Sequence, residues 1–281
     1  MAARFIDVHA HVNFAAYDQD RDEVVARALE NDTWMVNVGT QYDTSKKAVE
    51  MAERYEEGVY AIIGLHPIHT SRSRHDSEEL GEGAEDFTSR GEEFDMERYR
   101  ALAASPKVVG IGECGLDYYR LEAESIERQR EAFSRQIALA NEMNKPLMLH
   151  IRPSKEAGAP DAYDDAIAML KEQAKVAGNA HFFAGTALQA KKFSDLGFTV
   201  SFTGVITFTR DYDEAISSVP LDRLLSETDC PYVTPTPHRG KRNEPVFVAE
   251  VVRRLAAIKG IGEEEMAQAV MANARRLFGW E

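Results

Sequence analysis

A regular alternation of apolar, strand-like runs with helix-like segments constrains this chain more than any other feature. Eight apolar runs begin near residues 5, 34, 59, 108, 146, 180, 198 and 224. Helical patterns span residues 21–31, 45–56, 95–104, 122–143, 161–176, 187–196, 212–218, 245–259 and 263–277. Continuous apolar strands that alternate with helices indicate a parallel sheet covered on both faces. Eight such units predict an α/β fold, a (β/α)8 TIM barrel, which typically needs about 250 residues.

Residues 1–281 are expected to form a single domain, interrupted by an acidic loop at about 70–97. No Gly-x-Gly-x-x-Gly or Gly-x-x-x-x-Gly-Lys motif follows the first strand, which argues against a dinucleotide-binding or P-loop fold. Residues 76–97 hold ten acidic residues and one basic residue, a net −9 of the chain's −14. A negative net charge disfavours a broad nucleic-acid footprint. That objection is weak, because most of the charge belongs to one loop.

Cellular context is suggested by what the chain lacks. Neither end shows a secretory leader or a lipidation motif, and no apolar run approaches the ~18 residues of a membrane span. We therefore expect a soluble cytoplasmic protein with no membrane partner, and favour a monomer. Cys114 and Cys230 are expected to be free, buried thiols rather than metal ligands.

Potential metal ligands stand at or just after the carboxyl ends of the predicted strands. They are His9, His11, His66, Glu113, His150, His181 and Asp229. Each one alone is more simply explained as a satisfied buried side chain. In a (β/α)8 barrel, however, all strand carboxyl ends open on one face. Imidazoles and carboxylates that converge there predict a site for divalent ions, and their number exceeds what one tetrahedral zinc uses. Two ions about 3.5–4 Å apart, sharing a carboxylate, would favour hydrolysis.

Short motifs in a fixed order give the chain a family resemblance. They are Asp7-x-His9-x-His11, Gly64-Leu65-His66-Pro67, Gly112-Glu113-Cys114-Gly115-Leu116-Asp117-Tyr118, Leu149-His150-x-Arg152, His181-Phe182-Phe183-Ala184-Gly185 and Glu227-Thr228-Asp229-Cys230-Pro231. The segments Pro235-x-Pro237-x-Arg239-Gly240-x-x-Asn243-x-Pro245 and Asn273-Ala274-x-x-Leu277-Phe278 continue the pattern. The whole chain thereby resembles the TatD family of metal-dependent deoxyribonucleases.

The resemblance implies an amidohydrolase-type barrel that cleaves phosphodiesters with two divalent ions, such as zinc, magnesium or manganese. It implies that His9, His11 and Asp229 hold one ion and that His150 and His181 hold the other. Glu113 would bridge the two ions. Asp229, beside the attacking water, would also act as general base, so that Asp229 and Glu113 are the expected catalytic residues.

Substrate contacts are expected from four residues near the strand ends: His66, Asp117, Arg152 and Arg239. Arg152 lies two residues past His150 and so shares its strand face, where a guanidinium can hold a phosphate. Tyr118, Tyr119 and Tyr232 are candidates for base stacking. Compared with the family pattern, the loop at 70–97 is longer and more acidic. Residues 154–163 also form a longer connecting segment. Both segments are expected on the catalytic face.

Three functions remain open from the sequence. The leading one is a deoxyribonuclease, similar to a 3'-5' exonuclease, that trims single-stranded or frayed DNA ends. The second keeps the site and changes the substrate to a small phosphoester, amide or lactone, which the −14 charge mildly favours. The third is a non-catalytic metal-binding scaffold, which the full ligand set argues against.

Overall fold

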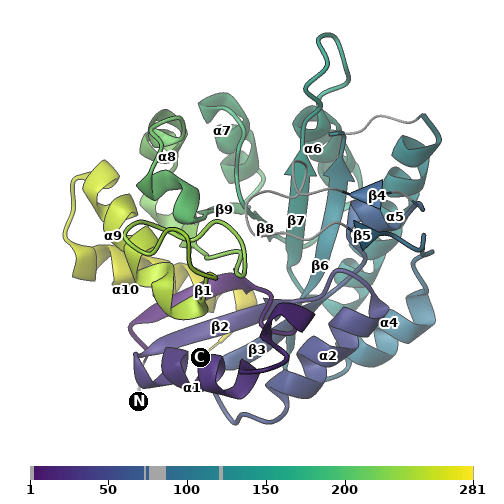
Figure 1. Cartoon of the computed structure of the whole chain (residues 1–281). Coiled ribbons are helices and arrows are strands. Elements are labelled where there is room, and N and C mark those ends of the chain that lie inside the picture. Colours follow the sequence, from purple (N-terminus) through teal and green to yellow (C-terminus); the bar gives the residue numbers. More distant parts are fainter. Residues whose placement is uncertain (1–2, 73, 76–86, 120–122, 281) are drawn as a thin grey trace.

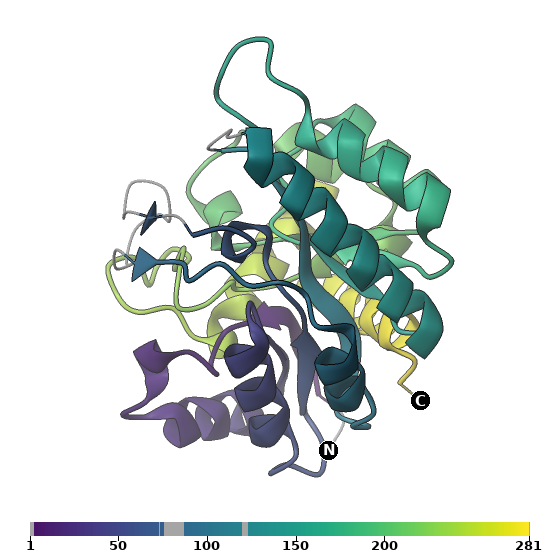
Figure 2. The ribbon, with the colours of Figure 1, turned by 90° about the vertical axis from the view of Figure 1, so that its right-hand side faces the viewer.

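The strands form one parallel, eight-stranded sheet that curls into a nearly closed barrel (Figures 1 and 2). The computed structural model describes residues 3–72, 74–75, 87–119 and 123–280. In sheet order the strands are β1 (Phe5–Ala10), β2 (Thr33–Val38), β3 (Val59–Ile63), β6 (Val108–Asp117), β7 (Leu147–Arg152), β8 (Gly178–Ala180), β9 (Thr199–Phe202) and β10 (Leu224–Ser226). The predicted (β/α)8 barrel is confirmed.

The two ends of the sheet meet where the chain leaves β10 beside β1. The N–H of Asp229 donates to the carbonyl of His9 at 2.9 Å, and the N–H of His11 donates to the carbonyl of Cys230 at 3.0 Å. The Ser226 hydroxyl also donates to the carbonyl of Ile6, at 3.1 Å. These bonds join the first and last strands beside His9, His11 and Asp229, so the closure of the barrel brings these candidate ligands together.

Helices surround the barrel, as Figure 1 shows. They are α1 (Arg21–Glu30), α2 (Tyr42–Ala52), α4 (Met96–Ala103), α5 (Ala123–Met143), α6 (Ala162–Gln173), α7 (Ala187–Asp195), α8 (Asp213–Ser218), α9 (Val248–Lys259) and α10 (Glu263–Phe278). Short 3-10 turns span η1 (Ala15–Tyr17), η2 (Pro67–His69), η3 (Gly204–Thr207), η4 (Leu221–Arg223) and η5 (Pro245–Phe247). Within the described parts of the chain, no helix combines the length and the apolar character needed to cross a bilayer.

Local sequence signals explain where the helices begin and end. The Asp161 side chain caps α6 by accepting from the N–H groups of Tyr163 and Asp164. A capping box of Thr186 and Gln189 begins α7. Gly260 ends α9 in the left-handed conformation, at φ 69°, which glycine adopts at little cost. These caps satisfy helix-end groups and hold the connections between helices and strands in place.

Strand β6 is four residues longer than its apolar run predicts. The sequence suggests an end at Glu113, but pairing with β7 continues from Cys114 opposite Leu149 to Asp117 opposite Arg152. All ten residues of β6 are buried. Because strand side chains alternate between faces, the extension puts Glu113, Gly115 and Asp117 on one face of the strand. Cys114 lies on the other face and, like Cys230, is a free, buried thiol as predicted.

The acidic loop is described only in part. Residues 73 and 76–86 lie outside the described residues, and with them most of the predicted acidic segment. The flanking strands β4 (Arg74–His75) and β5 (Phe87–Thr88) form a small antiparallel pair. Beyond it, Gln41 donates to Glu92 at 3.1 Å, and the guanidinium of Arg90 pairs with Asp43 and Glu92. These contacts fasten the end of the loop to α2.

Two glutamines of α5 bind the ends of two barrel strands in the same way. Gln136 accepts from the N–H of Leu65 at 2.8 Å and donates to its carbonyl at 2.9 Å. Gln129 accepts from the N–H of Asp117 at 2.8 Å and donates to its carbonyl at 2.9 Å. Each amide therefore replaces a neighbouring strand at a point where the sheet provides none. Both clamps lie directly beside candidate site residues.

Substitution of Gln136 by Leu is expected to lower the free energy of unfolding by about 2–6 kcal/mol. The change keeps the side-chain volume but leaves the buried N–H and carbonyl of Leu65 without partners, at about 1–3 kcal/mol each. Urea denaturation of the metal-free protein measures the loss. Gln268→Ala, on the exposed side of α10, is the control and should change stability by less than about 0.5 kcal/mol. A Gln136→Leu variant as stable as wild type would contradict the clamp.

Candidate metal centre

The barrel brings all of the predicted ligands together at its carboxyl end. His9 is on β1 and His11 follows it, Glu113 is inside β6, and His150 is on β7. His66, His181 and Asp229 come shortly after β3, β8 and β10. All except His150, which is partly exposed, are buried. Buried ionisable groups are costly unless they pair with one another or bind an ion.

One group of ligand atoms surrounds a point between β1 and β10. The Nε2 atoms of His9 and His11 lie 3.1 Å apart. Asp229 Oδ1 lies 3.4 Å from His11 Nε2 and 3.9 Å from His9 Nε2. Glu113 Oε2 completes the group, 3.4 Å from His9 Nε2 and 3.8 Å from His11 Nε2. We call these four side chains the first cluster.

A second group surrounds the other oxygen of the same glutamate. Glu113 Oε1 lies 2.8 Å from His181 Nε2, 3.0 Å from His150 Nδ1 and 3.3 Å from His66 Nε2. We call these four side chains the second cluster. Glu113 therefore presents one carboxylate oxygen to each cluster, which is the arrangement of a carboxylate shared by two ions.

The donor atoms of both clusters fit divalent ions. Within the described residues, both ring nitrogens of His181 and Nδ1 of His9 are buried and form no hydrogen bond. The Nε2 atoms of His9 and His11 face each other, although two neutral imidazoles can share at most one proton there. Nitrogen and carboxylate donors suit zinc and manganese, and magnesium where water completes its shell. A cation in each cluster would give the Nε2 atoms of His9, His11 and His181 a partner.

Electrostatics within the site are strongly coupled. Burial alone would raise the pKa of Glu113, but the imidazoles of His66, His181 and His9 hold it well below its ordinary value. Burial, together with the neighbouring His181, lowers the pKa of His9 to about 3. Burial would also lower the pKa of His181, but Glu113 and Glu227 raise it well above its usual value. The His9 and His181 rings stack with centroids 3.7 Å apart, so two positive charges there would repel.

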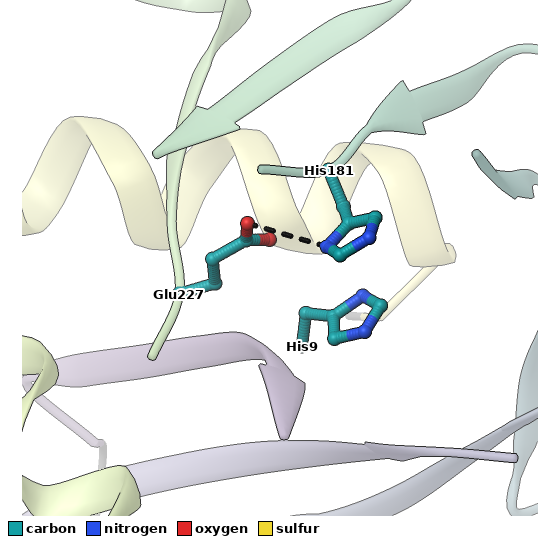
Figure 3. Close-up of side chains that lie close together, drawn as sticks. All are labelled: His9, His181 and Glu227. Carbon is teal, nitrogen blue, oxygen red and sulfur yellow. Dashed lines mark ion pairs between the residues drawn. The ribbon is translucent and has the colours of Figure 1, made fainter. Parts of the chain in front are cut away.

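Buried acceptors lie behind three of the candidate ligands, two at hydrogen-bond distance and one at the distance of an ion pair. Asp117 Oδ2 lies 2.8 Å from His150 Nε2, and the carbonyl of Val38 lies 2.8 Å from His11 Nδ1. Glu227 Oε1 lies 3.5 Å from His181 Nδ1. Figure 3 draws this ion pair. In each case the acceptor faces the ring nitrogen that points away from Glu113 or Asp229. Such partners orient metal-binding histidines.

Glu227 was not among the residues selected from the sequence. Its carboxylate accepts from the N–H of Phe182 at 2.5 Å and from the Ser201 hydroxyl at 2.6 Å. With both oxygens engaged and no exposed surface, it is better placed to orient His181 than to bind an ion itself. The spacing of two residues between Glu227 and Asp229 could have pointed to Glu227 in the sequence. Residues two apart in an extended segment share a face.

Replacing Glu227 by Gln is expected to weaken binding at the second cluster by about 10- to 100-fold, the usual cost of losing such an outer partner. The first cluster should keep its affinity. Titration of the metal-free protein with Zn²⁺, followed by calorimetry, measures both steps. Glu172→Gln, at an exposed position of α6, serves as the control. Equal weakening of both steps would show a general structural role instead.

Two of the four predicted substrate contacts lie at the second cluster, and the other two lie outside the clusters. His66 and Asp117 are buried against the second cluster. Arg152 ends β7, with its guanidinium carbon 3.9 Å from the ring centroid of Tyr119. Arg239 is exposed in the loop after β10, with its guanidinium carbon 4.1 Å from the ring centroid of Phe208. His66 and Asp117 thus lie within the candidate metal centre, and the two arginines lie outside it.

Of the predictions that aromatic side chains stack on bases, the one for Tyr118 is wrong. It is fully buried and its hydroxyl donates to Asp165 at 2.9 Å, so no base can reach the ring. The extension of β6 explains the error, because alternation turns Tyr118 outward against α6. Tyr119 and Tyr232 keep partial exposure. Burial raises the pKa of Tyr232 to about 12.

Comparison with known proteins agrees with the fold. A family profile described as TatD related DNase matches residues 6–279. The "Uncharacterized metal-dependent hydrolase YabD" of Bacillus subtilis (strain 168) is 40% identical over 277 residues, covering 97% of this chain and 98% of the relative. The 3'-5' ssDNA/RNA exonuclease TatD of Erwinia tasmaniensis is 33% identical over 282 residues, covering 97% and 98%.

A solved structure extends the agreement to three dimensions. The crystal structure of YJJV, a TatD homolog from Escherichia coli K12, has a TM-score of 0.78 and 27% identity, and the match covers 99% of both chains. Family profile, relatives and structure all span nearly the full length of the sequence. The chain therefore belongs to the TatD family of metal-dependent hydrolases.

Proposed function

We propose that this protein hydrolyses phosphodiester bonds at the ends of single-stranded DNA, as a 3'-5' exonuclease that uses two divalent ions. The observation that carries the proposal is the position of Glu113, with one oxygen in each cluster of imidazoles. His9, His11 and Asp229 would hold one ion, and His150 and His181 the other. Bound ions would supply an activated water and neutralise charge on the phosphate.

The residues of the chain have separate tasks in this reaction. Asp229 lies in the first cluster and would accept the proton of the attacking water. Glu113 would keep the two ions at a fixed separation. Asp117 and Glu227 would orient His150 and His181 from behind, and His66 would contact the substrate or the ion from the second cluster. Arg152 and Arg239 would hold phosphates from the rim.

The names of some relatives favour DNA as the substrate, and the net charge opposes it. The Erwinia tasmaniensis relative is named an exonuclease of single-stranded DNA and RNA. The net charge of −14 favours a small phosphoester, amide or lactone instead. Most of that charge belongs to residues 76–97, and the rim of the site carries arginines. We therefore place the nuclease first, with residues 1–281 acting as one domain.

Removal of metal is expected to abolish DNA degradation. A single-stranded oligonucleotide labelled at its 5' end reports shortening from the 3' end as a ladder of products, and one labelled at its 3' end distinguishes the opposite polarity. Protein dialysed against a chelator should be inactive and should recover with Mn²⁺, Zn²⁺ or Mg²⁺. Bis(p-nitrophenyl) phosphate is the small-ester comparison. Degradation that continues in excess chelator would refute the metal-dependent mechanism, and turnover of the small ester alone would refute the nuclease.

A further inference from the structure

We infer that two aromatic platforms, one on each side of the metal centre, bind two neighbouring bases of a single-stranded nucleic-acid end. The inference rests on the proposed nuclease function and extends it to substrate recognition. The first platform consists of Tyr119, Arg152 and Lys155. The second consists of Phe208 and Arg239. In both, a cation lies against an aromatic ring beside a strand end that carries a metal ligand.

The first platform is built on the ends of β6 and β7. The guanidinium carbon of Arg152 lies 3.9 Å from the ring centroid of Tyr119. The Lys155 ammonium lies 4.7 Å from the same centroid and donates to the Tyr119 hydroxyl at 3.1 Å. Two positive charges and one partly exposed ring therefore share a small surface. A base can stack on such a ring while the cations meet the adjoining phosphate.

A short chain of contacts links this platform to the second cluster. The N–H of Tyr119 donates to Asp117 Oδ1 at 3.0 Å, and the other oxygen of Asp117 lies 2.8 Å from His150 Nε2. Arg152 is also paired with Asp117 in the β6–β7 register. The backbone of Tyr119 is thus linked to the proposed metal ligand His150 through the carboxylate of Asp117. We therefore assign to this ring one base of a nucleotide whose phosphate would lie at the candidate metal centre.

The second platform is built on the loops after β9 and β10. Phe208 exposes 45% of its surface, and within the described residues only Leu188 is a more exposed large apolar side chain. The Arg239 guanidinium carbon lies 4.1 Å from its ring centroid, and Arg239 Nη1 donates to the carbonyl of Thr234 at 3.0 Å. The loops are joined by a hydrogen bond from the N–H of Thr236 to the Thr207 hydroxyl, at 2.9 Å. These bonds fix the loops that carry an exposed ring on which a base can stack.

The order of strands places the two platforms on different sides of the ligands. The first follows β6 and β7, the second follows β9 and β10, and β8, which leads into His181, lies between them (Figure 1). Glu113 and Asp229 stand at the same two sides as the first and second platforms, respectively. A flexible single strand that lays one phosphate across both clusters would direct its two flanking bases to opposite sides. A stiff duplex could not separate its stacked bases in this manner.

Abasic substrates test the assignment of one base to each platform. Tyr119→Leu and Phe208→Leu are each expected to lower kcat/KM on an intact oligonucleotide by roughly 10- to 100-fold, as for loss of one stacked base. On a substrate that lacks the base at one of the last two positions, the variant whose ring would bind that base should match wild type in kcat/KM to within about twofold. The other variant should still show its full loss relative to wild type. Moving the abasic site to the other position should exchange the two variants. Tyr55→Leu, a partly exposed aromatic residue after α2, is the matched control.

Each outcome separates this inference from the function on which it rests. Equal losses on intact and abasic substrates would show that the rings act structurally, and no loss on the intact substrate would show that they are not used. Either result overturns the platforms and leaves the nuclease standing. A wild-type protein that turns over bis(p-nitrophenyl) phosphate but no oligonucleotide would overturn both. Bound metal, measured for every variant, confirms that the centre is still formed.

Discussion

Glu113→Gln is expected to remove detectable DNA hydrolysis, with a loss of kcat of at least about 10³-fold. A metal acting as Lewis acid supplies several kcal/mol, and each 1.36 kcal/mol is a factor of ten in rate. The amide of Gln has one oxygen, whereas Glu113 presents one oxygen to His9 in the first cluster and another to His181 in the second. The variant should therefore bind fewer ions. Metal analysis after gel filtration and single-turnover kinetics measure the two effects.

The control for this substitution is Glu142→Gln, which removes a carboxylate of the surface pair with Arg100. It should retain both the metal content and the rate of wild type. A Glu113→Gln protein that carries its full complement of ions and is active to within tenfold would refute the shared carboxylate. Loss of ions with a normal circular dichroism spectrum would support it, because the spectrum would show that the variant is still folded.

Asp229→Asn is expected to lower kcat by about 10²- to 10⁴-fold, the usual contribution of a general base, with a smaller change in KM. Asn keeps an oxygen that can point at the ion near His11, whose Nε2 lies 3.4 Å from Asp229 Oδ1. It cannot accept the proton of the attacking water. Steady-state kinetics on the oligonucleotide, together with the metal content of the variant, separate lost proton transfer from lost metal.

The interpretation of the Asp229→Asn variant depends on whether kcat or the metal content changes. Nearly full metal content with a large fall in kcat would support the general base. Asp222→Asn, an exposed position in η4, should be indistinguishable from wild type. Turnover of every tested substrate at the wild-type rate by the Asp229→Asn protein would show that the catalytic assignment is wrong.

The sequence predicted the barrel well because its strands are buried on both faces. Runs such as Val59–Ile63 and Leu147–Leu149 are apolar throughout, which leaves parallel strands as the simple explanation. The positions of His9, His11, Glu113, His150, His181 and Asp229 at strand ends then followed from topology. The pattern of residue types along the sequence was enough to predict the site, because the barrel gathers the carboxyl ends of all its strands on one face.

Contacts between elements could not be predicted in the same way. The clamps of Gln129 and Gln136 look, in sequence, like ordinary polar positions of a helix. The outward turn of Tyr118 and the stacking of Arg152 on Tyr119 depend on where β6 ends, which is the least certain feature of any strand. The exposed Phe208 depends on a loop whose fold comes from η3 and the segment after β10. Such features arise from packing and register rather than from local residue preference.

The glutamine clamps imply a limit on how this enzyme can change during evolution. Gln129 and Gln136 are seven residues apart, so two helical turns, about 10.5 Å of rise, set the distance between the ends of β3 and β6. Insertion or deletion of one residue between them would rotate one amide by about 100° away from its strand. Length variation in α5 should therefore be confined to its two ends, while the stretch between the glutamines keeps a constant length in any descendant that still hydrolyses its substrate.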